Sequence, residues 1–175
     1  MRKLKIINYF CLSLVMVIGL LTVVASGGGG DDDSDTSDDT TIETFNDNGG
    51  TICTEDSKPV IRMFSTSTCP HCLWVDDTFN TVVQTYVTQG LIFAHHWELD
   101  TTTQTWDDLL TSEVEGTIPD SEIAIFDTYS GGYVPTFVFG CRYTRVGNGY
   151  ESENDLKAEA AEFRAVIEEL LDSVP

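Results

Sequence analysis

Residues 68–72 read Thr-Cys-Pro-His-Cys and follow a short apolar run, residues 59–64, which read Pro-Val-Ile-Arg-Met-Phe. A run of this length predicts a buried strand, and the helical spacing of the apolar residues after the motif predicts that a helix begins there. Two cysteines three positions apart at a helix start lie on its first turn, where unpaired backbone N–H groups and the helix dipole favour a thiolate. The pattern therefore predicts a redox site, with Cys69 as the exposed nucleophile and Cys72 as the shielded thiol that resolves the intermediate.

The two residues between the cysteines suit the same chemistry. Pro70 fits the first helical turn, because the N–H that proline lacks would have no helical partner there. His71 can add positive charge beside the first sulfur and so favour its thiolate form.

Two other interpretations of the motif stay open, a structural zinc site and an inert structural disulfide. Zinc takes four ligands, usually from a second Cys-x-x-Cys or from spaced histidines. This chain has neither, since Cys53 and Cys141 are isolated and His95 and His96 are adjacent. A purely structural disulfide would not need a helix start after a buried strand. Redox chemistry is therefore the favoured interpretation, and no metal site is expected.

The first 48 residues contain two segments of different composition. Residues 1–25 begin with basic side chains and continue as a mostly apolar stretch, which predicts either a cleaved export signal or an uncleaved membrane anchor. The working part of the protein is therefore expected outside the cytoplasm, either secreted or tethered to the membrane. Residues 26–48 are rich in Gly, Asp, Ser and Thr, which predicts a disordered acidic linker because they have little to bury.

The remaining residues, 49–175, are expected to form a single domain, since their number suffices for one hydrophobic core. The whole chain carries 29 acidic and 9 basic side chains, which gives a formal net charge of −20. Such a charge repels a phosphate backbone, so nucleic acid is not expected as a partner.

Strand and helix patterns alternate in this domain, which is typical of an α/β fold. The parallel pairing of the first two strands is expected because a helix connects them. In chain order the pattern predicts a strand at 59–64, a helix at 73–89, a strand at 91–99, a short amphipathic piece within 101–117, a helix between Pro119 and Gly131, a strand at 134–139, its hairpin partner at 142–146, and a last helix from Ser152 with a capping box to Asp155.

This order of elements resembles that of thioredoxin-fold proteins, and Cys69-Pro70-His71-Cys72 resembles the motif of DsbA-type disulfide oxidoreductases. The resemblance covers roughly residues 59–174. It implies a central mixed sheet flanked by helices, with a short helical insert before a cis-proline at Pro135. It also implies that Val134 offers its backbone to an extended substrate segment. From the residues alone, Pro135 would be an ordinary proline at the start of a strand.

The chain departs from this family at two places. Family members usually carry a buried acid six residues before the first cysteine, where this chain has Met63, and Glu98 is a candidate replacement. The insert at residues 101–132 is longer than in a minimal thioredoxin and shorter than the helical domain of DsbA-type enzymes. Substrate choice is therefore not carried over from the family.

Four further polar residues are assigned to structure. Strand alternation directs one of His95 and His96 inward and the other outward, and both are expected to be packed or exposed histidines rather than ligands. Asp76 and Asp77 are expected to favour the early turns of the helix that the motif opens.

Cys53 and Cys141 are predicted to form a structural disulfide. Cys53 precedes the strand that runs toward the motif, and Cys141 follows a neighbouring strand that is expected to run away from it. Both cysteines therefore belong at the end of the sheet that is far from the motif.

The predicted function is an extracytoplasmic thiol–disulfide oxidoreductase that needs no cofactor beyond the Cys69–Cys72 disulfide. Its expected partners are protein thiols and disulfides and an unidentified redox protein that resets the pair, and the oxidant or isomerase direction is favoured. The alternative is a module that binds thiols or a soft metal such as Cu(I) through Cys69 and Cys72, with His71 as a further ligand. That alternative expects more sulfur ligands nearby, whereas Met63 is the only methionine after residue 25.

Overall fold

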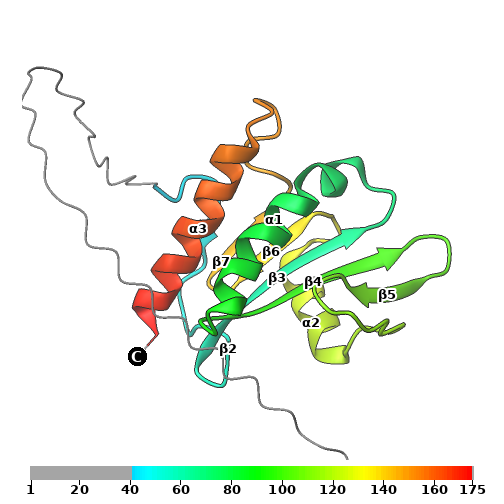
Figure 1. Ribbon diagram of the computed structural model, residues 1–175, viewed down its shortest axis with the longest axis horizontal. Helices are drawn as coiled ribbons and strands as arrows, with labels where there is room; N and C mark the ends of the chain where they lie inside the picture. Colours follow the sequence, from blue (N-terminus) through cyan, green and yellow to red (C-terminus); the bar gives the residue numbers. More distant parts are fainter. Residues whose placement is uncertain (1–40, 175) are drawn as a thin grey trace, which may run out of the picture. The chain divides into compact units, whose positions relative to one another are not determined.

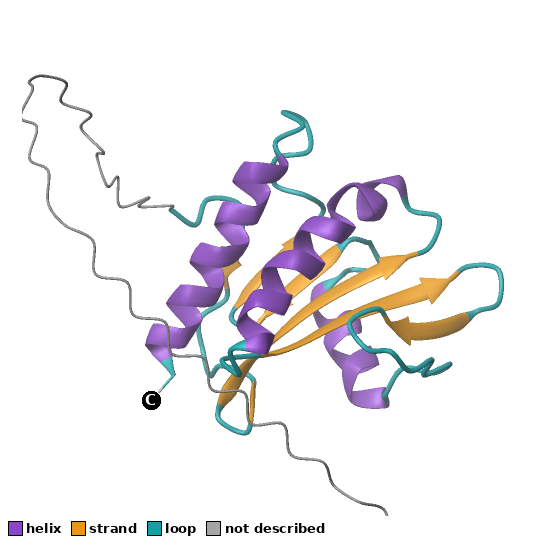
Figure 2. Ribbon diagram, in the orientation of Figure 1, coloured by secondary structure: helices purple, strands orange, loops and turns teal. Residues whose placement is uncertain are grey.

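The computed structural model describes residues 41–174, so the expected signal or anchor (1–25) and residues 26–40 of the expected linker lie outside the described part. Within that part, seven strands and three helices form an α/β unit with a mixed sheet (Figures 1 and 2). No helix of the described residues is long and apolar enough to cross a membrane. The elements are β1 (Asn46–Asp47), β2 (Thr54–Glu55), β3 (Lys58–Thr66), α1 (Pro70–Thr88), β4 (Phe93–Asp100), β5 (Thr105–Asp108), α2 (Asp120–Tyr129), β6 (Thr136–Phe139), β7 (Tyr143–Val146) and α3 (Leu156–Ser173).

The sheet is organised around β3, whose central residues are all buried. The strand order is β1-β7-β6-β3-β4-β5, and β2 pairs with the start of β3. β3 runs parallel to β4, as the sequence predicted, with Met63 opposite His96, and antiparallel to β6, with Met63 opposite Phe137. α1 makes the crossover that a parallel pair requires.

Two apolar clusters lie on opposite faces of this sheet. On one face, Ile61, Met63 and Phe137 pack under α1 and α3, which cross the front of the sheet in Figure 1. On the other face, Phe64 and Val138 pack under α2. The alternation of β3 residues between the faces follows from the two-residue period of a strand. Burial of both sheet faces explains why residues 59–64 are apolar apart from Arg62, whose buried guanidinium pairs with the carboxylate of Glu122.

The sequence predicted that the domain begins at Gly49, but the folded unit begins several residues earlier. Phe45 is buried against the aromatic rings of the larger cluster, and β1 pairs with β7. The buried carboxylate of Glu162 accepts hydrogen bonds from the backbone N–H groups of Glu43 and Thr44, at 2.6 Å each. Residues 41–48 are therefore part of the domain rather than of a linker. No periodic pattern marks residues 41–48 in the sequence, because a single aromatic residue, Phe45, anchors a polar segment.

The region between β4 and β6 contains a strand as well as the expected helix. The amphipathic piece within residues 101–117 is β5, which pairs antiparallel with β4 and so extends the sheet. Trp106 of β5 packs against the apolar cluster under α2. α2 follows Pro119 as predicted and ends before Gly131. The sequence of β5, Thr-Trp-Asp-Asp, has a single apolar residue and therefore shows no strand alternation.

The start of α3 differs from the predicted capping box. Asp155 itself is the N-cap, and its carboxylate accepts hydrogen bonds from Lys157 N and Ala158 N, at 3.0 and 2.9 Å. Ser152 lies in the preceding turn and bonds to the side chain of Glu153 instead. An aspartate N-cap satisfies free N–H groups in the first turn of the helix as a serine does, but the helix begins three residues later than predicted.

Candidate functional site

Cys69 caps the N-terminus of α1. Its backbone has an extended conformation, and its sulfur accepts a hydrogen bond from the backbone N–H of Cys72, at 3.2 Å. Pro70 occupies the first helical turn, as the sequence predicted. The sulfur therefore lies at the positive end of the helix dipole, beside backbone N–H groups that have no helical partner.

The two cysteines of the motif differ in exposure and acidity. Both are free thiols, so the structure represents the dithiol form of the pair. Cys69 is half-buried, whereas Cys72 is only 2% exposed. Burial raises the pKa of the Cys72 thiol well above its usual range, and the hydrogen bond to Cys69 and the charge of Asp76 act in the same direction. Cys72 therefore keeps its proton, and Cys69 is the thiol available for attack.

The segment that opens β6 faces this pair. The Val134–Pro135 peptide bond is cis, as the family resemblance implied. The carbonyl oxygen of Val134 lies 3.9 Å from the sulfur of Cys69. The sequence residues 69–72 and 134–135, which are far apart in the chain, are thus brought together at one end of the sheet.

A polar cluster lies beside Cys72, between α1 and β4. The ring of His96 is fully buried, and its Nε2 lies 2.9 Å from Ser65 Oγ. Its Nδ1 lies 2.8 Å from Asn80 Oδ1 and 3.2 Å from Asp76 Oδ1, two acceptors one helical turn apart on α1. Burial lowers the pKa of His96 to about 4, so at neutral pH the ring is uncharged and donates only from Nδ1.

Asp76 lies in an early turn of α1, as its sequence position indicated, and its carboxylate faces the ring of His96. It lies beyond the first turn of α1, and its Oδ1 is buried without a hydrogen bond of its own. Burial raises the pKa of this carboxyl, with a further contribution from the charge of Asp77. Sequence reasoning missed it because it searched for the acid six residues before Cys69. The signal that could have found it is its position four residues after Cys72, which puts both side chains on one face of the helix.

Met63 and Glu98 complete this comparison with the family pattern. The position six residues before Cys69 is occupied by Met63, which is fully buried in the larger apolar cluster and cannot accept a proton. Burial raises the pKa of Glu98, and the charge of Asp76 raises it further. The charge of Asp76 contributes to the raised pKa of Cys72, which makes Asp76 the better candidate of the two carboxyls.

A loop that sequence reasoning did not connect with the motif forms a further side of the site. We call residues 147–155, between β7 and α3, the site loop. The N–H of Gly147 donates to the carbonyl of Pro135 at 2.8 Å. The side-chain amide of Asn148 donates to the backbone carbonyl of His71, also at 2.8 Å. The loop therefore contacts both halves of the site, the motif and the cis-proline segment.

The site loop directs His71 away from the expected role of a free cation beside Cys69. Nδ1 of His71 lies 2.8 Å and 3.0 Å from the two carboxylate oxygens of Glu151. No hydrogen bond joins the His71 ring to the Cys69 sulfur among the residues that the structure describes. Hydrogen bonds from Asn148 and His71 outweigh burial and lower the pKa of Glu151. Glu151 is therefore an ionised acceptor for His71 at neutral pH.

The second cysteine pair is a disulfide, as predicted. Cys53 and Cys141 are bonded, with their Cα atoms 5.4 Å apart and 88 positions between them in the chain. Cys53 precedes β2, and Cys141 lies in the turn between β6 and β7. The bond lies against the apolar cluster under α2, at the end of β3 where that strand begins.

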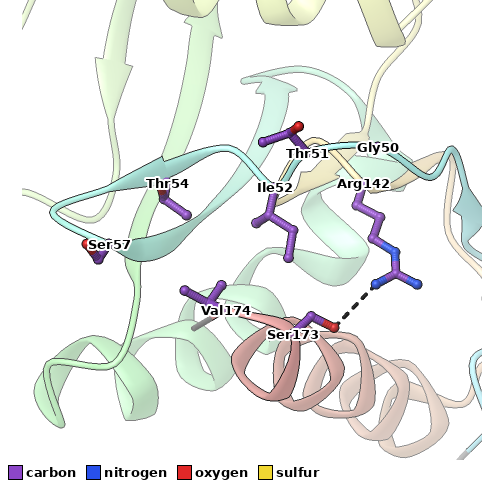
Figure 3. A pocket seen from close by; sticks show the side chains of 8 residues that line it. All are labelled: Gly50, Thr51, Ile52, Thr54, Ser57, Arg142, Ser173 and Val174. Atoms are coloured by element: carbon purple, nitrogen blue, oxygen red, sulfur yellow. Dashed lines mark hydrogen bonds between the residues drawn. The ribbon is translucent and has the colours of Figure 1, made fainter.

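The cleft in Figure 3 lies near this disulfide rather than near the motif. It has a volume of about 450 Å³, and Arg142 donates a hydrogen bond across it to Ser173. No group of three or more metal-ligating side chains occurs among the described residues. The residues that line the cleft are Gly50, Thr51, Ile52, Thr54, Ser57, Arg142, Ser173 and Val174.

His95 and His96 follow the predicted alternation. His96 points into the cluster beside Cys72, and His95 points to the other face, where its Nδ1 lies 2.7 Å from Asp108 Oδ2.

Comparison with protein-family models, curated proteins and solved structures finds no match for this chain. The functional conclusion therefore rests on the geometry of the site.

Proposed function

We propose that this protein is a thiol–disulfide oxidoreductase with a thioredoxin-like fold, related in its motif to DsbA-type enzymes. The observation that carries the proposal is the placement of Cys69 as the N-cap of α1, half-buried, with the buried thiol of Cys72 in the same turn. Such a position makes one sulfur reactive and the other protected. The mixed sheet, the helices on both faces and the cis-proline beside Cys69 support the fold assignment.

In the oxidising direction, a substrate thiolate attacks Sγ of Cys69 in the bridged pair. The bond between Cys69 and Cys72 breaks, a substrate–Cys69 disulfide forms, and Cys72 leaves as a thiolate that takes up a proton. A second substrate thiolate then attacks the substrate sulfur of that mixed disulfide and releases Cys69. Two electrons pass from the substrate dithiol to the Cys69–Cys72 pair, which a disulfide-bearing redox partner must oxidise again.

In the reducing direction, the Cys69 thiolate attacks a substrate disulfide, and Cys72 resolves the mixed disulfide. Cys72 must first lose its proton, which burial opposes. Asp76 is the proposed proton acceptor. Its charge contributes to the raised pKa of Cys72, and burial raises the pKa of its own carboxyl, which brings it closer to neutral pH. Nδ1 of the buried His96 ring lies 3.2 Å from Asp76 Oδ1, so the two side chains face each other between α1 and the sheet.

Protein chains with accessible thiols or disulfides are the proposed substrates. The carbonyl of Val134 lies next to Cys69, so backbone pairing there would hold an extended segment without reading its side chains. The Cys53–Cys141 disulfide is typical of proteins that work in oxidising compartments, which supports a location outside the cytoplasm, secreted or tethered through residues 1–25.

The test compares Cys69→Ser with Cys72→Ser in insulin reduction and in oxidative refolding of a reduced protein. Cys69→Ser should lose all activity and trap nothing, because the attacking sulfur is gone. Cys72→Ser should accumulate disulfide-linked substrate adducts, visible on non-reducing gels, because the resolving thiol is missing. Equal inactivity without adducts, together with stoichiometric Cu(I) binding by the wild type, would support the metal-binding alternative instead.

A further inference from the structure

Glu151 and His71 form a contact whose protonation is fixed by its geometry. Both oxygens of the Glu151 carboxylate lie within 3.0 Å of Nδ1 of His71. An ionised carboxylate can only accept hydrogen bonds, so Nδ1 must carry the proton. Nδ1 of His71 therefore faces the site loop and donates its hydrogen bond to Glu151.

The site loop holds Glu151 in place from several directions. The amide of Asn148 bridges Glu151 Oε2 and the backbone carbonyl of His71, at 2.8 Å each. The fully buried carboxylate of Glu159 accepts hydrogen bonds from the N–H groups of Gly149 and Tyr150, at 3.0 Å each. Arg145 pairs with Glu159 from the sheet. An isolated surface ion pair would have little effect, but here Asn148 ties the Glu151 carboxylate to the backbone of His71.

We propose that Glu151 is a positioning residue that limits the oxidising power of the Cys69–Cys72 pair, by holding the His71 imidazole on the site loop and opposing its charge. The inference rests on the proposed function and adds to it the residue that tunes the redox equilibrium. The helix N-terminus and His71 both favour the Cys69 thiolate, and so favour the reduced form. Glu151 weakens the histidine contribution, and the disulfide is less readily reduced than the motif alone would make it.

The test measures the equilibrium between the protein and glutathione for the full chain. The protein disulfide and two glutathione thiols exchange to the protein dithiol and one glutathione disulfide, so one S–S bond breaks as another forms. The variant is Glu151→Gln, which keeps the size of the side chain and removes its charge. The matched control is Glu153→Gln, an exposed acid of the same loop whose side chain, within residues 41–174, accepts a hydrogen bond from Ser152 alone.

At about pH 6, where histidine side chains carry substantial positive charge, Glu151→Gln should shift this equilibrium toward the dithiol about three- to tenfold. Tenfold corresponds to about 30 mV in reduction potential. Glu153→Gln should shift it less than about twofold, because it removes the same charge without freeing the imidazole. A shift for Glu151→Gln no larger than that of Glu153→Gln would overturn the inference.

A double-mutant cycle with His71→Gln separates positioning from a bare charge effect. If Glu151 acts through the imidazole, Glu151→Gln should have a clearly smaller effect in the His71→Gln background than in the wild type. An equal effect in both backgrounds would overturn the inference, because it would show a direct field on the sulfur. If the wild-type pair does not exchange with glutathione at all, the proposed function fails along with the inference. If the wild-type pair exchanges with glutathione and Glu151→Gln shifts the equilibrium no more than Glu153→Gln does, the inference fails but the proposed function stands.

Discussion

The two cysteine pairs of this protein lie at opposite ends of β3 and differ in almost every physical respect. Cys53 and Cys141 are 88 positions apart in the chain, are bonded to each other, and lie against an apolar cluster. Cys69 and Cys72 are in one helical turn, are free, and face the cis-proline segment and the site loop.

The difference shows that surroundings, rather than the cysteine side chain, decide what a sulfur does. A bond that closes a long loop restricts the unfolded chain and so stabilises the fold. A pair three residues apart restricts very little, so its stabilisation of the fold is small. The sulfur of Cys69 instead accepts a hydrogen bond from a backbone N–H at the start of α1, while Cys72 lies buried behind it, an arrangement that suits exchange rather than stabilisation.

The largest expected effect comes from removing the disulfide. Replacing Cys53 and Cys141 by alanine should lower the free energy of unfolding by up to about 4 to 5 kcal/mol, because the closed loop is long. The same replacement at Cys69 and Cys72 should change it by no more than about 1 kcal/mol. Urea denaturation of both variants gives the comparison. Equal destabilisation by the two double variants would contradict the assignment of separate roles.

A smaller effect, on rate alone, is expected for Asp76→Asn. Without a proton acceptor, resolution of the mixed disulfide by Cys72 should slow by about tenfold or more. In the wild type the rate should fall as the pH drops through the raised pKa of Asp76, since only the ionised carboxyl accepts a proton. The variant should lack the inflection that Asp76 causes and keep only the pH dependence that comes from ionisation of Cys72 itself. Rapid alkylation of a preformed mixed disulfide would measure the step.

The matched control for that prediction is Asp77→Asn, because Asp77 is the exposed neighbour on α1. Unfolding should also separate the two variants. A raised pKa means that the folded state disfavours the ionised form of Asp76, a penalty that is present at neutral pH and disappears below the pKa of the unfolded chain. Asp76→Asn should therefore leave stability unchanged or raised at pH 7. Similar slowing by both variants would remove Asp76 from the mechanism.

The smallest expected effect is that of His71→Pro on the redox equilibrium. The substitution removes the imidazole, leaves the charge of Glu151 uncompensated, and keeps the first turn helical, since proline is tolerated there. The Cys69–Cys72 disulfide should become harder to reduce, by a few-fold in the glutathione equilibrium. Titration of the thiolate absorbance against pH should show a smaller thiolate fraction at neutral pH. An unchanged equilibrium would mean that His71 does not influence the sulfur.

The sequence was most informative where local pattern and chemistry coincide. The strand before the motif, the helix that Pro70 opens and the parallel pairing with β4 all follow from apolar spacing and turn residues, and the structure confirms them. The pairing of Cys53 with Cys141 followed from strand direction alone.

Features that depend on contacts between distant segments were not predictable in this way. Phe45 and the carboxylate of Glu162 fix the start of the domain from opposite ends of the chain, so no local pattern marks it. The approach of Glu151 to His71 joins residues 80 positions apart. Asp76 had a local signal, its helical spacing from Cys72, which the expectation of an acid at position 63 concealed.

A redox titration that reports both cysteine pairs in the same sample is the most direct measurement. The full chain would be equilibrated with glutathione buffers, its free thiols alkylated, and each pair quantified by peptide mass spectrometry. Cys69–Cys72 should pass reversibly between dithiol and disulfide at a potential in the range of about −270 to −120 mV, where thiol–disulfide oxidoreductases lie. Cys53–Cys141 should remain bonded throughout, as structural disulfides below about −300 mV do. A Cys69–Cys72 pair that never forms its disulfide, or two pairs that reduce together, would contradict the proposed function.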